Sequence, residues 1–407
     1  MVATVIGQVL ALAGIAVVAL LLTRVSRLEL TLSCVLCGFL AGQGIALLDF
    51  DTGIRAHNLE EIVFYVILPV LIFEASWHIK PTLLRRWLLP VLLLATVGVI
   101  VSCGVTAALT WFGIGHPAGF PWTAALITGA ILAATDPVSV ISQLSAREAP
   151  EDLKTLFEGE SLFNDATAVV LFSLFLALAM QGGEVGGQQL LIQFAVVFLG
   201  GILVGVVLGM LSAMLVLVLK NPASSAFILL FTAFGSFYVA EHLLHVSGIM
   251  AVMFAALVLR AQLAEVGEQV APGTVFTWEW LGQVFTCLLF VLMGLVITRA
   301  MFTDMWLAML VAIGAALAAR ACAVLVCGLL TRPFAHRIPW GWQILLFWGG
   351  LRGAIAVALV LALPIELEYW YTVQSMVFGV VLFSLLVQGT TNGSLIARYA
   401  VIEERGA

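Results

Sequence analysis

Residues 121–143 of the chain read PWTAALITGAILAATDPVSVISQ, and this stretch decides the fold. It is apolar and long enough to cross a bilayer as a helix, yet Asp136 and Pro137 lie near its middle. Proline lacks a backbone donor and its ring clashes with the preceding turn, so the helix is expected to break there. The break would leave free carbonyl groups beside a carboxylate at membrane depth. The stretch therefore predicts a transmembrane helix that is broken at a polar centre.

A second apolar stretch is interrupted in a matching way by Gly349-Gly350-Leu351-Arg352-Gly353. Glycine destabilises the centre of a helix because it loses the most conformational freedom on folding. Two broken spans, one in each half of a chain, are expected of a transporter built from inverted repeats. We expect spans one to six and eight to thirteen to form two inverted six-helix repeats, whose broken helices cross at mid-membrane.

Of the 407 residues, 63% are hydrophobic and 10% are charged, whereas an ordinary soluble domain has about 25% charged residues. Lipid is therefore expected to be the solvent for most of the chain, and the fold class is an all-α polytopic membrane protein. The apolar runs predict about thirteen transmembrane helices, at residues 2–22, 29–48, 60–78, 87–112, 121–143, 156–180, 188–219, 224–240, 246–262, 280–299, 305–330, 340–363 and 369–395.

The basic residues gather on one side of the expected bundle. With the N-terminus outside, every Lys and Arg outside the spans except Arg55 and Arg299 falls on the cytoplasmic side, as the positive-inside rule requires. The C-terminus is then cytoplasmic. The chain carries no organelle-targeting signal and no basic block that suggests a nucleic-acid partner, so we expect a bacterial-type plasma membrane.

Six ionisable residues fall inside the predicted spans. A charge at membrane depth costs at least ~2.5–3.5 kcal/mol, so each needs a partner or a water-filled cavity. Together they predict a polar centre, and the alternative is a set of ion pairs that only hold the bundle together. The six are Glu74, Asp136, Glu160, Asp165, Arg320 and Arg352.

Ser161 and Asp165 are four residues apart, so on a helix they share one face. A carboxylate, a hydroxyl and a carbonyl freed by the break at Pro137 can replace the hydration shell of a monovalent cation. The same carboxylate can take up a proton. One carboxylate that binds either species, but not both together, is sufficient for coupled exchange.

The motifs together resemble the cation/proton antiporter family of NhaP and NHE type. Five stretches carry this resemblance in the family order, and they extend over nearly the whole chain. They are Leu68-Pro69-Val70-Leu71-Ile72-Phe73-Glu74-Ala75, Thr135-Asp136-Pro137, Gly159-Glu160-Ser161 with Asn164-Asp165, Glu241 to Val258 with Ser247-Gly248, and Gly349-Gly350-Leu351-Arg352-Gly353-Ala354.

The resemblance implies a role for each polar residue of the centre. Asp165 is the expected cation and proton carrier, and Na+ is expected at Asp165, Ser161, Glu74 and Thr135, with Asp136 completing the site directly or through water. Asn164 is implied to hold the crossing of the two broken helices, and Glu160 to pair with Arg320. The Asn-Asp form resembles the electroneutral branch, which exchanges one Na+ or Li+ for one H+. No cofactor is implied.

The resemblance also implies a domain plan and a homodimer that works by elevator-like alternating access. Residues 1–85 are expected to form scaffold and dimer helices 1–3, and residues 86–181 core helices 4–6. Residues 182–300 are expected to hold linker helix 7 and scaffold helices 8–10, and residues 301–395 core helices 11–13. Residues 396–407 are expected to be a short cytoplasmic tail without a large regulatory domain.

Several alternatives stay open at this point. A K+/H+ antiporter needs the same site chemistry in a cavity of different size. A cation channel could use two broken helices to line a pore, and an intramembrane enzyme could use Asp136 and Asp165 as an aspartyl dyad, although we expect no enzyme. The partner of Arg352, either Asp136 or a helix end, also stays open.

Two further patterns concern packing. Small residues at i, i+4 and i+8 permit close helix contact, within the chain or in a dimer, at Gly201, Gly205 and Gly209. Four tryptophans near span ends are expected to form an interfacial belt, namely Trp278, Trp280, Trp340 and Trp342.

Overall fold

The computed structural model describes residues 2–26, 28–47, 62–79, 81–114, 119–180, 187–263, 274–334 and 337–400. The described part of the chain is helical, with no strand. The first six spans are α1 (Val2–Ser26), α2 (Leu30–Leu47), η1 (Val63–Ile67) continued by α4 (Leu68–His78), α5 (Pro81–Leu93) continued by η2 (Leu94–Gly98) and α6 (Val99–Gly113), the pair α7 (Trp122–Ile131) and α8 (Val138–Ser145), and α9 (Glu151–Met180).

The remaining seven spans follow after residue 186. They are α10 (Gly187–Leu219), α11 (Pro222–Tyr238) with η3 (Val239–Leu243), α12 (Gly248–Leu263), α14 (Thr274–Val296), α16 (Trp306–Thr331), the pair α17 (Trp340–Trp348) and α18 (Ala354–Leu361), and α19 (Trp370–Phe383) with η4 (Ser384–Gln388) and α20 (Gly389–Tyr399). The short helix α15 (Arg299–Asp304) links α14 to α16. Thirteen spans in the described residues agree with the prediction.

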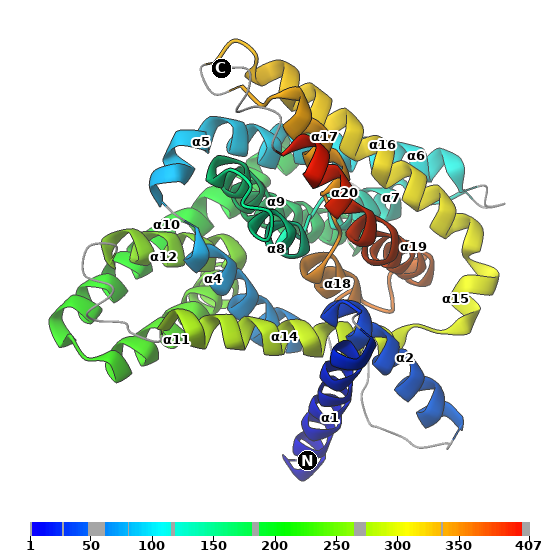
Figure 1. The fold of residues 1–407 in the computed structure, drawn as a ribbon, viewed down its shortest axis with the longest axis horizontal. Coiled ribbons are helices and arrows are strands. Elements are labelled where there is room, and N and C mark those ends of the chain that lie inside the picture. Colours follow the sequence, from blue (N-terminus) through cyan, green and yellow to red (C-terminus); the bar gives the residue numbers. More distant parts are fainter. Residues whose placement is uncertain are drawn as a thin grey trace.

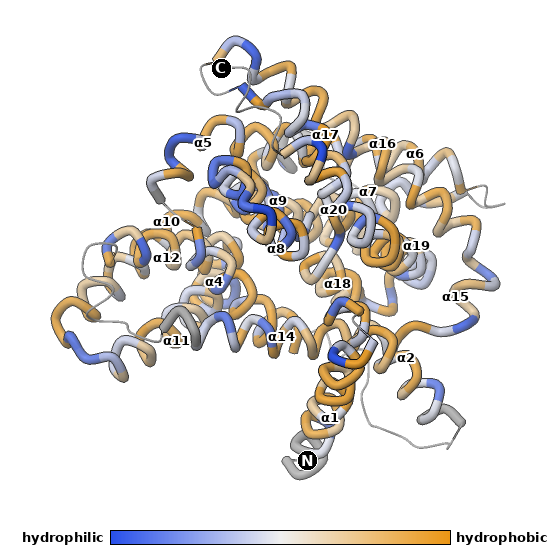
Figure 2. The backbone as a smooth tube through the Cα atoms, in the orientation of Figure 1, coloured by the Kyte–Doolittle hydropathy of each residue, from blue (hydrophilic) through white to orange (hydrophobic). Residues whose placement is uncertain are grey.

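Eight of these helical stretches are long and apolar enough to cross a bilayer unbroken, and the others are shorter or interrupted. Apolar residues dominate nearly every helix in Figure 2. On α1 and α10 they are also exposed, for example Leu10 at 65% and Leu203 at 67%. Such faces suit lipid rather than water, so the chain is a multi-pass membrane protein.

The helix ends differ from the predicted boundaries by a few residues. The fourth span begins at Pro81 rather than residue 87, because proline suits the first helical turn and Arg85 and Arg86 continue the helix. The sixth begins at Glu151 rather than residue 156, with acidic Glu151 and Asp152 in the first turn, where the helix dipole favours them. The last span continues to Tyr399, and residues 401–407 of the expected tail lie outside the described residues.

The helices gather in two groups (Figure 1). In one group α10 packs on α12, α2 on α14, and α14 on α4. In the other, α16 packs on α6 and α19, while α7 packs on α6 and α9. The broken pairs α7–α8 and α17–α18 both belong to the second group. The site is therefore built where this group meets α4, α12 and α14.

Small residues set the spacing inside the first group. A Cβ atom on Gly205 would collide with the backbone of Ala251, and Gly201 and Gly209 lie equally close to α12. The regular glycines of α10 thus pack within the chain rather than against a second copy.

The four tryptophans near span ends differ in exposure, and their place in a membrane interface stays a prediction. Trp280 and Trp340 are exposed, whereas Trp278 packs on Phe73 and Trp342 on Trp87.

Candidate ion-binding site

The two broken helices meet at their breaks. The backbone N–H of Asp136, in the first break, donates to the Leu351 carbonyl in the second, at 2.8 Å. Gly353 lies so close to the Asp136 side chain that a Cβ atom would collide with it. The crossing predicted from Pro137 and the glycines is therefore present, and residues 132–137 and 349–353 form its unwound backbone.

Asp136 caps two helices at once. Its Oδ1 atom accepts from the backbone N–H of Val138 at 3.0 Å, and its Oδ2 atom accepts from that of Ala354 at 3.2 Å. These donors lie in the first turns of α8 and α18, where unpaired N–H groups and the helix dipole favour a negative charge. One carboxylate thus compensates both positive helix ends of the crossing.

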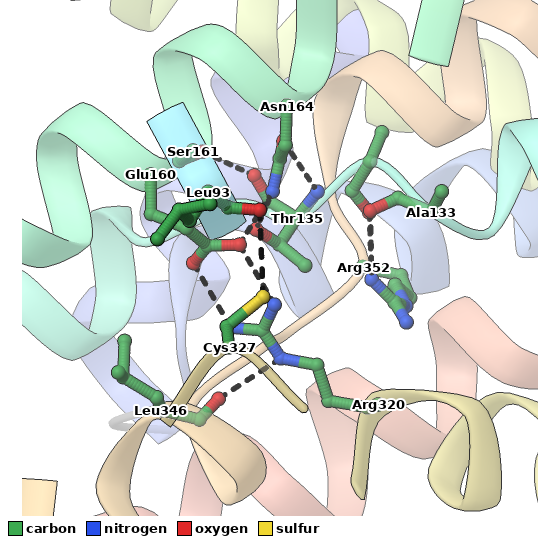
Figure 3. Close-up of polar contacts among 11 residues, drawn as sticks. Leu93, Ala133, Thr135, Glu160, Ser161, Asn164, Arg320, Cys327, Leu346 and Arg352 are labelled. Atoms are coloured by element: carbon green, nitrogen blue, oxygen red, sulfur yellow. Dashed lines mark hydrogen bonds and ion pairs between the residues drawn. The ribbon is translucent and has the colours of Figure 1, made fainter. Parts of the chain in front are cut away.

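Arginine side chains contact the carbonyl ends of α7 and α17, where the helix dipole is negative. Arg352 donates through Nη1 to the carbonyls of Ala133 and Ala134, at 3.3 and 3.0 Å, just beyond α7. Arg320 donates through Nε to the Leu346 carbonyl of α17 at 3.0 Å. The open question about Arg352 is settled in favour of the helix end. Figure 3 shows both guanidinium groups directed at these carbonyl ends.

Glu160 and Arg320 form a buried bidentate ion pair, with N···O distances of 2.7 and 2.9 Å. Their side chains are 2% and 7% exposed, so the pair lies away from water. Asn164 joins this pair to the first break (Figure 3): its amide donates to Glu160 at 2.8 Å and to the Thr135 hydroxyl at 2.6 Å. Its Oδ1 atom accepts from the Thr135 backbone at 3.3 Å. Asn164 thus ties α9 to the crossing, as expected.

Ser161 and Asp165 stand beside the same backbone. The Ser161 hydroxyl donates to the Thr135 carbonyl, and Asp165 follows Ser161 by one helical turn on α9. The Oδ1 atom of Asp165 is buried without a hydrogen-bond partner among the described residues. An oxygen of this kind has free capacity for a proton or a cation.

A cavity of about 420 Å³ lies beside Asp165. It is lined by Thr135, Asp136, Ser161 and Asp165 on one side and by Glu74 on the other. Asn164, Glu160 and Arg320 stand behind this wall rather than in it. The structure therefore brings all five predicted cation and proton ligands to one cavity.

The charges of the crossing do not cancel. Asp136, Glu160 and Asp165 supply three carboxylates, and Arg320 and Arg352 supply two guanidinium groups. When all five are ionised, one negative charge remains, and Glu74 is a further carboxylate of the cavity.

A second, smaller cavity of about 180 Å³ lies farther along α9, towards its C-terminal end. Val169, Val170 and Ser173 line it from α9, and Glu241 and His245 line it from the other side. Ile249 lines both cavities and is only 2% exposed. The two cavities thus share one lining residue, which is apolar and buried.

Proteins of known family resemble this chain in sequence. The sequence profile of the family described as "Sodium/hydrogen exchanger, transmembrane" matches residues 11–398. The chain belongs to the sodium/hydrogen exchanger family. It is 35% identical over 371 residues to "Na(+)/H(+) antiporter ApNhaP" of Aphanothece halophytica, covering 90% of this chain and 69% of the relative. It is 31% identical over 366 residues to "Na(+)/H(+) antiporter NhaP" of Pseudomonas aeruginosa, covering 88% and 85%.

A solved structure has the same fold as this sodium/hydrogen exchanger. It is the sodium proton antiporter MjNhaP1 of Methanocaldococcus jannaschii at pH 8, with a TM-score of 0.84 and 20% sequence identity. The alignment covers 98% of this chain and 100% of that one.

Three polar residues near the cavity of this exchanger were missed by sequence reasoning. His78 lies 3.5 Å from the Glu74 carboxylate and 3.2 Å from Glu279, so it links α4 to α14. Glu29 reaches the same cavity from the connection before α2. These residues stand at span ends, where charge is common, so the sequence offered no signal that separates them from other loop residues.

Proposed function

We propose that this protein is a secondary active antiporter that exchanges Na+ or Li+ for H+ across a membrane. The observation that carries the proposal is the buried Oδ1 atom of Asp165, which has no hydrogen-bond partner among the described residues, in a residue that lines a cavity together with Thr135, Asp136, Ser161 and Glu74. Na+ and the proton are the substrates, and they compete for this carboxylate. The curated relatives named above, both Na+/H+ antiporters by name, support the same reaction.

Each lining residue has a role in the proposed site. Asp165 binds the cation or the proton, and the Ser161 hydroxyl and Thr135 oxygens complete the ligand set. Glu74 contributes from the opposite wall, and Asp136 acts through water because its two oxygens already cap α8 and α18. Asn164, Glu160, Arg320 and Arg352 hold the crossing in place.

Competition of one cation and one proton for a single carboxylate supports electroneutral exchange. One Na+ or one H+ neutralises the Asp165 carboxylate, so both loaded forms of the site have the same charge. A 1:1 exchange then moves no net charge across the membrane.

Two separate cavities along α9, which share the apolar lining residue Ile249, suit alternating access. We propose that residues 86–181 and 301–395 form a core that moves by an elevator-like motion against a scaffold of residues 1–85 and 182–300. The scaffold would form a homodimer in the bilayer. The asymmetry of basic residues supports an external N-terminus, a cytoplasmic C-terminus and a bacterial-type plasma membrane.

The test is transport in proteoliposomes with a lumenal pH dye. Wild type and Asp165→Asn are compared after addition of NaCl, LiCl or KCl, with and without a potential clamp. Asp304→Asn, on the exposed helix α15, is the matched control. We expect Na+ and Li+ to move protons in the wild type and the control, with no effect of the clamp, and no response in Asp165→Asn.

Other outcomes would support an alternative function or contradict the proposed carrier. A response to KCl alone would assign the K+/H+ reaction, and cation flux without proton movement would assign a channel. A normal response in Asp165→Asn would contradict the proposed carrier.

A further inference from the structure

Gln388 makes a contact with the second broken helix that the proposed ion site does not use. Its amide Nε2 atom donates to the backbone carbonyl of Trp348 at 3.1 Å. Trp348 is the last residue of α17, and the last carbonyls of a helix have no partner within that helix. Gln388 is 3% exposed, so its amide takes the place of water at a buried helix end.

Two partners fix the orientation of the Gln388 amide. The Ser384 hydroxyl donates to its Oε1 atom at 2.9 Å. The Trp348 carbonyl can only accept, so the NH2 group must face it. Ser384 and Gln388 belong to η4, where the backbone N–H of Gly389 bonds to the Ser384 carbonyl five residues earlier. Wide turns of this kind often occur at functional sites. The local helix geometry thus directs the amide at α17.

Two further contacts tie the same segment to the broken helices. The indole Nε1 atom of Trp348 donates to the Thr391 hydroxyl of α20 at 2.9 Å. Gln143 of α8 donates to the Gly389 carbonyl at 3.1 Å. α20 packs on both α8 and α17 (Figure 1). The segment η4–α20 therefore holds the half-helix that leaves the first break and the half-helix that enters the second.

Gln388 also lies beside the arginines of the crossing. It lines a gap of about 10 Å³ together with Arg320 and Arg352. A gap of this size has room for about one water molecule, so the packing around the amide is tight. The amide thus joins the groups that contact the carbonyl ends of the broken helices.

The distance along the chain from this contact to the ion site is short. Trp348 is three residues before Leu351, whose carbonyl accepts from the backbone N–H of Asp136 at 2.8 Å. Two glycines separate Trp348 from Leu351. Glycine backbone resists displacement little, so the position of Leu351 depends on the contacts at either side of the break. Gln388 provides one of these contacts.

We propose that Gln388 is a positioning residue, which anchors the carbonyl end of α17 and so keeps Leu351 where it can hold Asp136. The inference rests on the proposed function, because Asp136 belongs to the proposed ion site. Loss of the amide donor raises the Na+ concentration for half-maximal exchange about three- to tenfold, the effect of one hydrogen bond, and leaves the maximal rate within about twofold.

The first test needs no ion and measures hydrogen–deuterium exchange by mass spectrometry in detergent. Gln388→Met keeps the length of the side chain but has no donor, and Ser384→Ala is a milder change that removes the bond to Oε1. Gln374→Met makes the same substitution at another buried glutamine, on α19, and is the matched control. The amides of residues 133–138 and 349–353 should exchange about three- to tenfold faster in Gln388→Met, less so in Ser384→Ala, and at the wild-type rate in the control.

The second test is transport in proteoliposomes over a series of Na+ concentrations. The half-maximal concentration should rise in Gln388→Met and remain at the wild-type value in Gln374→Met. Gln388→Met combined with Ser384→Ala should raise it no further, because Ser384 acts through Gln388.

Unchanged hydrogen exchange at both segments in Gln388→Met would overturn the proposal. Faster exchange that spreads to helices as far away as α10, or that leaves the Na+ dependence unchanged, would overturn it too. If Gln388→Met does not fold, Ser384→Ala decides, since it weakens the same contact and keeps the amide. Absence of Na+/H+ exchange in the wild type would contradict the proposed function, whereas the hydrogen-exchange result would still show whether Gln388 anchors α17.

Discussion

At the residue scale, Asp136 and Asp165 line one cavity but make different contacts. Both oxygens of Asp136 accept backbone hydrogen bonds at helix starts, whereas Asp165 keeps Oδ1 without a partner among the described residues. Replacing a carboxylate with an amide removes one acceptor oxygen and the charge. The two Asp→Asn variants should therefore fail in different ways.

Asp136→Asn is expected to lower the thermal stability of the protein more than Asp165→Asn does. The reason is the loss of one cap at α8 or α18, which costs about 0.5–2 kcal/mol, together with the charge at two positive helix ends. Thermal unfolding in detergent measures the difference. A lower melting temperature for Asp165→Asn than for Asp136→Asn would contradict the double-cap assignment.

Glu160→Gln is expected to reduce the yield of folded protein strongly. The substitution leaves the Arg320 guanidinium buried without its partner, at a cost on the order of 3–5 kcal/mol. Glu160→Gln combined with Arg320→Gln removes both charges, and part of the yield should return. Fluorescence-detected size-exclusion chromatography measures folded protein. If Glu160→Gln alone folds and transports normally, the pair does not hold the core together.

The polar centre could be predicted from the sequence because charge inside an apolar run stands out. The contacts within it depend on tertiary structure. Ser161 and Asp165 share a helix face by spacing alone, but the partner of Arg352 lies more than 200 residues away in the chain. Glu29 and Trp278 show the limit at span ends, where neither burial nor exposure follows from residue type.

At the element scale, the crossing depends on an approach that glycine alone permits. A Cβ atom on Gly353 would overlap the Asp136 side chain, and one on Gly282 of α14 would crowd Glu74. The sequence indicated where the helices break, because proline and glycine act locally. It did not indicate which helix ends face each other, since that depends on how α7 and α17 pack.

Gly353→Ala is expected to abolish transport and to destabilise the crossing, because Asp136 must move and can no longer cap both α8 and α18. Gly314→Ala in α16 is the matched control, since a Cβ atom there meets no other atom within 4 Å. Alanine favours a helix over glycine by roughly 0.5–1 kcal/mol, so the control should be neutral or slightly stabilised. Transport and melting temperature are measured on both variants. Equal behaviour of the two would show that the crossing tolerates a methyl group.

At the scale of the whole molecule, the number of spans followed from the thickness of the bilayer, which sets a minimum length for each apolar run. The two cavities could not be predicted in that way, because they arise where helix groups fail to fill the space between them. Ile249 borders both, and its side chain is almost fully buried. An exchanger must keep such cavities apart, since a continuous path would let protons cross without a cation.

Ile249→Ala is therefore expected to open a proton leak. Removing most of the side chain leaves a space between the two cavities that water can enter, because both are partly lined by polar groups. Proteoliposomes with an imposed pH gradient and no Na+, Li+ or K+ measure the leak directly. Val252→Ala, also buried on α12 but lining neither cavity, is the control and should hold the gradient as the wild type does. A gradient held equally well by Ile249→Ala would mean that other side chains form the barrier, and that the cavities are separated by more than one residue.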